Sequence, residues 1–111
     1  MTGNEPAIRQ LSAPELKALI DSGATLELID VRTEEECAMA RIDGFRLLDQ
    51  SYHDALIQLD RATPMVFQCH LGVRSQQAAR YFQSLGFSNL VNLQGGIDAW
   101  SLTVDPSVPR Y

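Results

Sequence analysis

Residues 65–86 read MVFQCHLGVRSQQAARYFQSLG, and this stretch decides the expected fold. Its first four residues, which follow Pro64, are largely apolar and typical of a short buried strand. From Ser75 to Leu85 the apolar residues recur at helical spacing, and Gly86 is a residue that commonly ends a helix. The stretch therefore predicts a strand that passes, through a loop beginning at Cys69, directly into a helix.

Similar strand and helix signals lie on both sides of this stretch, separated by Gly, Pro or capping residues. Ser12 and Glu15 have capping-box spacing, and Thr33 precedes three glutamates, so helices are expected to begin at both places. Such alternation is typical of α/β units around a parallel sheet. Strands are expected at residues 8–11, 26–30, 45–48, 65–68 and 89–93, and helices at 13–23, from 34 to before Gly44, and at 51–59, 75–85 and 97–102.

The length and composition fit one domain with one hydrophobic core. The chain has 111 residues, of which 45% are hydrophobic and 21% charged. We expect a single domain over residues 1–111, with the core within about residues 8–102. The tail at residues 103–111 contains two prolines and is expected to be extended.

Charge and cysteine content exclude several classes of function. The net charge is −5 and the pI about 4.8, so nucleic acid is not an expected partner. The two cysteines, Cys37 and Cys69, have no Cys or His neighbour at zinc-ligand spacing, so neither a metal site nor a disulfide framework is expected. The segment from Met1 to Pro6 is polar and no apolar run reaches membrane-spanning length. A cytoplasmic protein without membrane contact is therefore expected.

The loop that begins at Cys69 has the features of an anion site. Cys69 follows a strand end, where ligands collect in α/β sheets, and precedes a helix start, whose free amides favour negative charge. Gly72 permits a tight turn in which successive amides converge, and Arg74 adds a cation. These features predict a lowered thiol pKa and a nucleophilic Cys69 thiolate.

Simpler roles compete with this interpretation. A lone cysteine at the end of a core strand, such as Cys69, is usually a small apolar core residue, but the features of the loop that follows favour a functional role for it. Cys37, which lies on an acidic helix, is given the structural interpretation. His70 either assists proton transfer or is an exposed loop residue, and the sequence leaves both open. His53 lies in a polar stretch away from any nucleophile and is assigned no role.

Four separated motifs resemble one protein family. Residues 29–32 read IDVR with Glu35 and Glu36 after them, and residues 69–75 read CHLGVRS. Residues 85–87 read LGF, and residues 93–100 read LQGGIDAW. From about Ile8 to Trp100 the chain therefore resembles the rhodanese-like sulfurtransferase family.

This resemblance implies a small doubly wound α/β domain, with a central mostly parallel sheet of about five strands flanked by helices. It also implies a catalytic cysteine, here Cys69, that cycles between thiolate and persulfide. The donor would be a small sulfur anion such as thiosulfate, and the acceptor a thiol, cyanide or a protein; no cofactor is implied. The resemblance assigns binding of the transferred sulfur to His70, Leu71, Gly72, Val73 and Arg74, and supporting roles to Asp30, Arg32 and Ser75.

The chain departs from the family pattern at two places. Residues 41–44 read RIDG where relatives often have His-Ile-Pro-Gly, which puts in doubt any contact that this segment makes in relatives. Cys37 stands where the family usually has an aromatic residue. The tail is similar to the endings of rhodanese domains attached to adenylating enzymes that activate sulfur carriers, which suggests a protein acceptor.

Three other functions compete with sulfur transfer. A phosphatase or arsenate reductase of related fold would have a loop with five residues between its Cys and its Arg. In this chain only four residues lie between Cys69 and Arg74, which argues against this function. A non-catalytic docking module usually lacks the nucleophile, which is present here. A redox switch would need Cys37 and Cys69 within disulfide reach, which sequence does not reveal. The oligomeric state is likewise left open.

Overall fold

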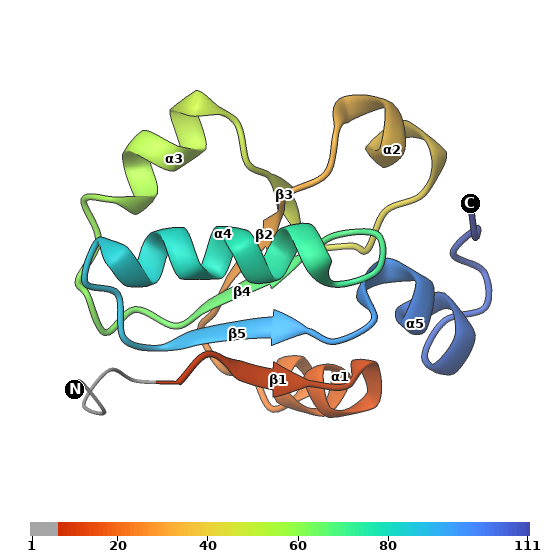
Figure 1. Ribbon diagram of the computed structural model, residues 1–111. Helices are drawn as coiled ribbons and strands as arrows, with labels where there is room; N and C mark the ends of the chain where they lie inside the picture. The colour runs from red at the N-terminus through yellow and green to blue at the C-terminus, as the bar shows by residue number, and fades with distance from the viewer. Residues whose placement is uncertain (1–6) are drawn as a thin grey trace.

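The computed structural model describes residues 7–111, which form an α/β domain around one parallel sheet (Figure 1). The expected fold class is therefore confirmed, whereas the polar segment Met1 to Pro6 lies outside the described residues. All neighbouring strands pair in parallel, in the order β1-β5-β4-β2-β3. The strands are β1 (Arg9–Leu11), β2 (Glu27–Asp30), β3 (Arg46–Leu47), β4 (Met65–Gln68) and β5 (Leu90–Leu93).

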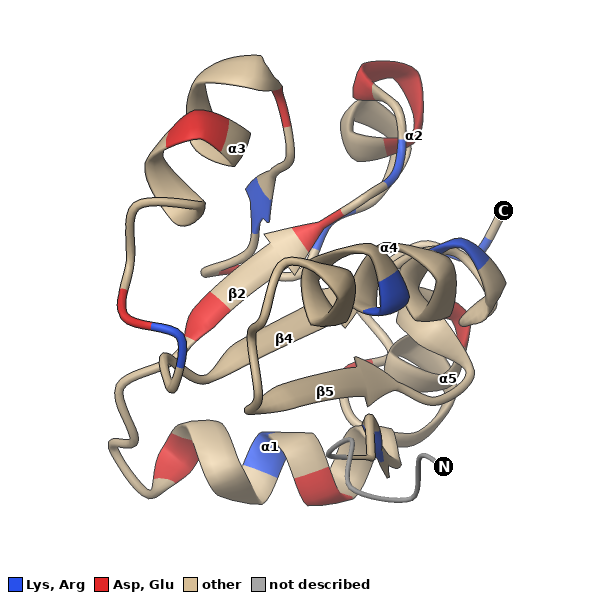
Figure 2. Ribbon diagram, turned by 60° about the vertical axis from the view of Figure 1, so that its left-hand side comes forward, with Lys and Arg blue, Asp and Glu red and all other residues tan. Residues whose placement is uncertain are grey.

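Helices cover both faces of this sheet, as Figures 1 and 2 show. One face is covered by α1 (Ala13–Asp21) and α5 (Gly96–Thr103), and the other by α3 (Gln50–Leu56) and α4 (Val73–Ser84). The short helix α2 (Glu34–Met39) lies beyond the carboxyl end of β2. This arrangement leaves the carboxyl edge of the sheet flanked by α2 and the starts of α4 and α5.

Two hydrophobic clusters pack against the sheet, one on each face, and strand β4 supplies side chains to both. Met65 and Phe67 pack among the residues under α3 and α4, whereas Val66 packs with Trp100 on the α1 and α5 side. All three β4 side chains are fully buried. A central parallel strand is covered on both faces, which is why its sequence reads as a continuous apolar run.

The capping signals in the sequence correspond to real helix starts. Ser12 Oγ accepts a hydrogen bond from the Glu15 amide at 3.2 Å, and the Glu15 carboxylate accepts one from the Ser12 amide at 2.8 Å. Thr33 and Glu36 make the same reciprocal pair at the start of α2. The expected capping box at Ser12 is therefore confirmed, and Thr33, which was expected only as a cap, forms a second capping box, because such pairs depend only on residues three positions apart.

Some helix bounds and faces differ from the expectation. Helix α4 begins at Val73, two residues before the expected Ser75, because Gly72 adopts a left-handed conformation with φ of 101° and serves as the N-cap. Helix α3 ends at Leu56 instead of at the expected residue 59, and Ala55 near its end is exposed. Leu85, at the end of α4, is 36% exposed rather than part of the core.

The tail folds back onto the domain instead of extending away from it. The Val108 amide donates to the Asp105 carbonyl oxygen at 3.1 Å, forming a turn, and the Val108 carbonyl oxygen accepts a hydrogen bond from Ser101 Oγ. Val108 is buried. Across residues 7–111, no helix combines the length and the apolar character required to cross a membrane.

Candidate functional site

Cys69 is the first residue after β4, at the carboxyl edge of the sheet. Strand β4 lies between β2 and β5, so elements from both sides surround the thiol, which belongs to a residue only 1% exposed. This edge is where ligands bind in open α/β sheets. The structure therefore places the candidate nucleophile at the strand-to-helix junction expected from the sequence.

Hydrogen bonds to the Cys69 sulfur favour its thiolate form. Burial raises the pKa of Cys69, but hydrogen bonds from Ser75 and from the amides of Gly72 and Leu71 outweigh burial, so its pKa lies below that of an ordinary cysteine. The Gly72 amide donates to Sγ across 3.1 Å, and Ser75 Oγ lies 3.3 Å from Sγ. The expected lowering of the thiol pKa is thus explained by named contacts.

The hydroxyl hydrogen of Ser75 has two possible acceptors. Ser75 Oγ lies 2.6 Å from Asn92 Oδ1, closer than it lies to Cys69 Sγ. Because a serine has only one hydroxyl hydrogen, donation to Asn92 leaves none for the thiolate. The backbone amides face no such competition, so they stabilise the thiolate whichever acceptor the Ser75 hydroxyl takes.

Asn92 fixes the turn of the loop from the neighbouring strand β5. Its side chain accepts from Ser75 and donates from Nδ2 to the Gly72 carbonyl oxygen at 3.2 Å and to Gln10 at 2.9 Å. Asn92 is 3% exposed. A buried amide with all these bonds satisfied orients its partners closely, so Asn92 sets the positions of Gly72 and Ser75 around Sγ.

The start of α5 supports the other side of the loop. The Ile97 amide donates to the Cys69 carbonyl oxygen at 2.8 Å, and the Asp98 amide donates to that of His70 at 3.2 Å. Gly96 has φ of 60°, and a Cβ there would lie 2.3 Å from the Cys69 carbonyl oxygen. The glycine is required because the helix start approaches the loop backbone this closely.

The loop surrounds Cys69 with backbone and presents apolar side chains to solvent. Leu71 is 58% exposed and Val73 67% exposed. His70 is half-buried, and its ring stacks on that of Tyr111, with centroids 4.0 Å apart and planes inclined by 12°. Of the loop residues named from the sequence, the amides of Gly72 and Leu71 stabilise the sulfur, whereas no side chain between Cys69 and Arg74 bonds to it among the described contacts.

Arg74 makes no hydrogen bond to the thiol among the described contacts and is held by a carboxylate. Its guanidinium donates two hydrogen bonds, of 2.8 and 2.9 Å, to the carboxylate of Glu36 on α2. This pairing raises the pKa of Arg74, and the charge on Cys69 adds a smaller rise. Attraction between Arg74 and the thiolate therefore acts through space, while Glu36 orients the guanidinium.

Asp30 and Arg32 form a buried ion pair at the end of β2. Arg32 donates to the Asp30 carboxylate from Nη2 at 2.7 Å and from Nε at 3.0 Å, and the two side chains are 0% and 3% exposed. Arg32 Nη1 also donates to the Tyr111 hydroxyl at 3.1 Å. The pair thus braces the tail and α2, which in turn contact the Cys69 loop.

Cys37 lies against this ion pair. Its sulfur is 3.6 Å from Asp30 Oδ2 and 3.7 Å from Arg32 Nη2. Burial and the Asp30 charge raise the pKa of Cys37, and both cysteines are free thiols. A raised pKa disfavours the thiolate, so Cys37 is a poor nucleophile compared with Cys69.

Three residues that shape the site were not among the predicted site residues. Asn92 interrupts the apolar run of β5, and a polar residue in a buried strand was a usable signal. Glu36 was noted in a motif, but its partner Arg74 lies 38 residues away in sequence. Tyr111 had no local signal, because its contacts arise only from the folding of the tail.

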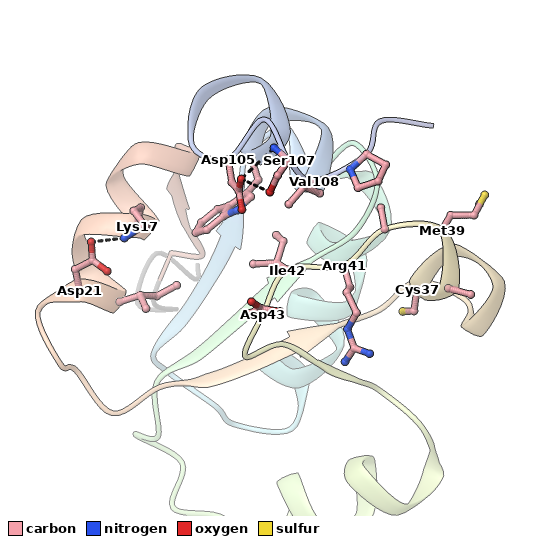
Figure 3. Close-up of a pocket in the computed structure, with 15 residues that line it drawn as sticks. Lys17, Asp21, Cys37, Met39, Arg41, Ile42, Asp43, Asp105, Ser107 and Val108 are labelled. Carbon is pink, nitrogen blue, oxygen red and sulfur yellow. Dashed lines mark hydrogen bonds and ion pairs between the residues drawn. The ribbon is translucent and has the colours of Figure 1, made fainter.

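A cavity of about 520 Å³ lies away from the Cys69 loop, between α1, α2 and the tail (Figure 3). Arg41 and Asp43, the residues that depart from the family pattern, line it together with Cys37 and Val108. Cys69 is not among its lining residues. Within residues 7–111, no three His, Cys, Asp or Glu side chains gather as metal ligands would.

Comparisons with known proteins agree with this geometry. A family model described as a rhodanese-like domain matches residues 12–103. The thiosulfate sulfurtransferase GlpE of Ectopseudomonas mendocina is 33% identical over 96 residues, which cover 86% of each chain. The probable adenylyltransferase/sulfurtransferase MoeZ of Mycobacterium tuberculosis is 39% identical over 100 residues, 87% of this chain but only 26% of MoeZ, so the chain spans about a quarter of that relative.

The fold comparison gives the same result. The crystal structure of a rhodanese-like domain protein from Staphylococcus aureus superposes with a TM-score of 0.74 at 28% identity, covering 94% of this chain and 99% of that one. The family match covers most of the chain, including the sheet edge that holds Cys69. The chain belongs to the rhodanese-like domain family.

Proposed function

We propose that this protein is a sulfurtransferase that carries a sulfane sulfur as a persulfide on Cys69. The observation that carries the proposal is the buried Cys69 sulfur, which accepts a 3.1 Å hydrogen bond from the Gly72 amide and has a lowered pKa. A thiolate held by amides at a sheet edge is suited to nucleophilic attack. Relatives named thiosulfate sulfurtransferase support this chemistry.

The first half-reaction transfers one sulfur atom to the enzyme. The Cys69 thiolate attacks the outer sulfur of a donor such as thiosulfate, and a sulfur–sulfur bond forms. The sulfur–sulfur bond of the donor breaks, and its electron pair leaves with sulfite. The persulfide keeps one negative charge, which the loop amides are placed to stabilise.

The second half-reaction restores the thiolate. An acceptor thiolate, cyanide or a protein nucleophile attacks the outer sulfur of the persulfide, and the bond to Cys69 breaks with its electron pair returning to Sγ. No net oxidation occurs over the cycle, so no external redox cofactor enters the equation. Reduced cysteines, as in the cytoplasm, suit this cycle.

The loop favours a transferred sulfur over a phosphoryl group. Arg74 is engaged on its two terminal guanidinium nitrogens by Glu36, and Leu71 and Val73 expose apolar side chains. The loop therefore offers amides more than a free guanidinium, which suits one sulfur atom better than a tetrahedral oxyanion. The exposed apolar side chains are also suited to contact an acceptor protein.

A persulfide assay tests the proposal. Protein incubated with thiosulfate is expected to release sulfite and to gain one sulfur atom on Cys69, detected by mass spectrometry of the intact protein and of the peptide that contains Cys69. Cys69→Ser should abolish both signals, whereas Cys37→Ser should keep both. Hydrolysis of an aryl phosphate without any sulfur gain from thiosulfate or from an alkyl persulfide would contradict the proposal.

A further inference from the structure

Tyr111 contacts the Cys69 site although it lies outside the residues matched by the family model, which end at 103. Its ring stacks face to face on His70, the residue that follows Cys69, with ring centroids 4.0 Å apart. Its hydroxyl donates to Glu36 Oε2 at 2.6 Å and accepts from Arg32 at 3.1 Å. One side chain thus contacts the loop, α2 and the buried ion pair.

The path of the tail holds Tyr111 in this place. Ser101 on α5 donates to the Val108 carbonyl oxygen at 2.5 Å, and Val108 itself is 8% exposed. Arg110 donates to the Asp98 carboxylate at 2.8 Å. Asp98 also supplies the amide that bonds the His70 carbonyl oxygen, so the tail is attached to the same helix start that supports the loop. In Figure 1 the tail passes beside α5 and ends near α2.

Through these contacts Tyr111 connects the two ends of the loop. At one end, its ring covers a face of His70, whose backbone precedes the amides of Leu71 and Gly72 that stabilise the sulfur. At the other end, its hydroxyl bonds the same Glu36 carboxylate that engages Arg74.

We propose that Tyr111 is a positioning residue of the sulfur-transfer site, which keeps the loop from Cys69 to Arg74 in its anion-binding conformation by stacking on His70 and orienting Glu36. This inference deepens the proposed function and rests on it for its role in sulfur transfer. Tyr111 itself touches neither the sulfur nor the reacting atoms in any described contact. It acts on the backbone amides through His70 and on Arg74 through Glu36.

The chain contains a matched control for this arrangement. Tyr81 stacks on His53 with centroids 5.6 Å apart, and its hydroxyl lies 2.7 Å from His53 Nε2. This second Tyr–His pair joins α3 and α4 and includes no residue of the Cys69 loop. Substitution of Tyr81 therefore removes a tyrosine–histidine stack that includes no residue of the Cys69 loop.

The test measures the rate of Cys69 alkylation by iodoacetamide as a function of pH in a Cys37→Ser background. In Tyr111→Ala the midpoint of this profile is expected to rise by at least about half a pH unit, roughly a threefold loss of thiolate at pH values below the midpoint. Tyr81→Ala is expected to leave the midpoint unchanged. His70 and the charged groups described around the loop are retained in every variant; these charged groups are Asp30, Arg32, Glu36, Arg74, Asp98 and Arg110.

An unchanged midpoint in Tyr111→Ala would overturn the inference, even if the plateau rate rose, because the tail would then only cover the site. If Tyr111→Ala does not fold, the same midpoint is measured in Tyr111→Leu. This variant keeps an apolar side chain but has neither the ring face nor the hydroxyl, so the same rise is expected. Alkylation does not require sulfur transfer. A protein that takes no sulfur from thiosulfate or from an alkyl persulfide but shows the midpoint shift would refute the proposed function while leaving the positioning role intact.

Discussion

Among the described glycines, Gly96 leaves the least space for a side chain. Its backbone runs so close to the loop that a Cβ would lie 2.3 Å from the carbonyl oxygen of Cys69 and 2.5 Å from that of His70. Both contacts involve backbone atoms, which cannot rotate away as a side chain can. Any larger residue must therefore displace either α5 or the loop.

Gly96→Ala is expected to lower the free energy of unfolding by about 1–3 kcal/mol more than Gly23→Ala, measured by urea denaturation. Gly23 also has a positive φ, of 82°, but nothing lies within 4 Å of a Cβ there, so it controls for backbone strain alone. The same Gly96 variant should lose most of its persulfide formation, because the amides move away from Sγ. Equal losses in stability from the two substitutions would show that the close approach has no energetic effect.

At the scale of elements, α2 supplies the carboxylate that orients Arg74. Glu36 occupies the third position of the helix, where its carboxylate closes the capping box with Thr33 and also accepts from Arg74 and Tyr111. The hydrogen bond from Arg74 holds the pKa of Glu36 far below its ordinary value, assisted by Tyr111 and the Thr33 amide. One side chain thus joins the start of α2 to the start of α4.

This lowered pKa predicts a pH dependence of stability. The unfolded chain binds the Glu36 proton first as pH falls, so the stabilisation is complete above the unfolded pKa of about 4.3 and is lost at lower pH. When the pH is lowered from about 6 to about 3, the free energy of unfolding should therefore fall less in Glu36→Gln than in the wild type. Chemical denaturation at each pH measures this difference. Because the Arg74 side chain is 44% exposed, solvent screening keeps the difference near 1 kcal/mol or less.

Glu34→Gln is the control, since it removes the same charge from the same helix turn. It should follow the wild-type dependence on pH more closely than Glu36→Gln does. If the free energy of unfolding changes with pH in the same way in both variants, the effect comes from the negative charge of α2 in general and not from the bond with Arg74.

At the scale of the whole molecule, the Asp30–Arg32 pair joins parts that are far apart in sequence. Arg32 on the β2 side reaches Tyr111, 79 residues away, and the Glu36 carbonyl oxygen on α2. Both charged side chains are removed from water. The pair therefore holds the sheet, α2 and the tail in one arrangement around the site.

Arg32→Met is expected to cost about 3–5 kcal/mol in free energy of unfolding, because it leaves the Asp30 carboxylate buried without its partner. Asp30→Leu combined with Arg32→Met should recover much of that loss in the same denaturation experiment, since no unpaired charge is then buried. A double variant less stable than Arg32→Met would show that the ion pair itself is a large net source of stability.

Much of this protein was determined by local sequence signals. The strand from Met65 to Gln68, the following helix, the capping box at Ser12 and the cap at Thr33 were predicted because each depends on residues a few positions apart. The position of Cys69 at the strand end followed from the same signals. The helix bounds were less accurate, because the left-handed Gly72 and the burial of each helix face depend on packing.

Only the tertiary structure decided what surrounds the thiol. Asn92 reaches Ser75 across 17 residues, Glu36 reaches Arg74 across 38, and Tyr111 reaches Glu36 across 75. Such contacts leave no periodic trace in the sequence, since they form when parallel strands bring their carboxyl ends to one edge and the tail folds over it. Sequence alone determined that Cys69 stands at this edge, whereas the fold decided that Arg74 pairs with Glu36 and that Tyr111 stacks on His70.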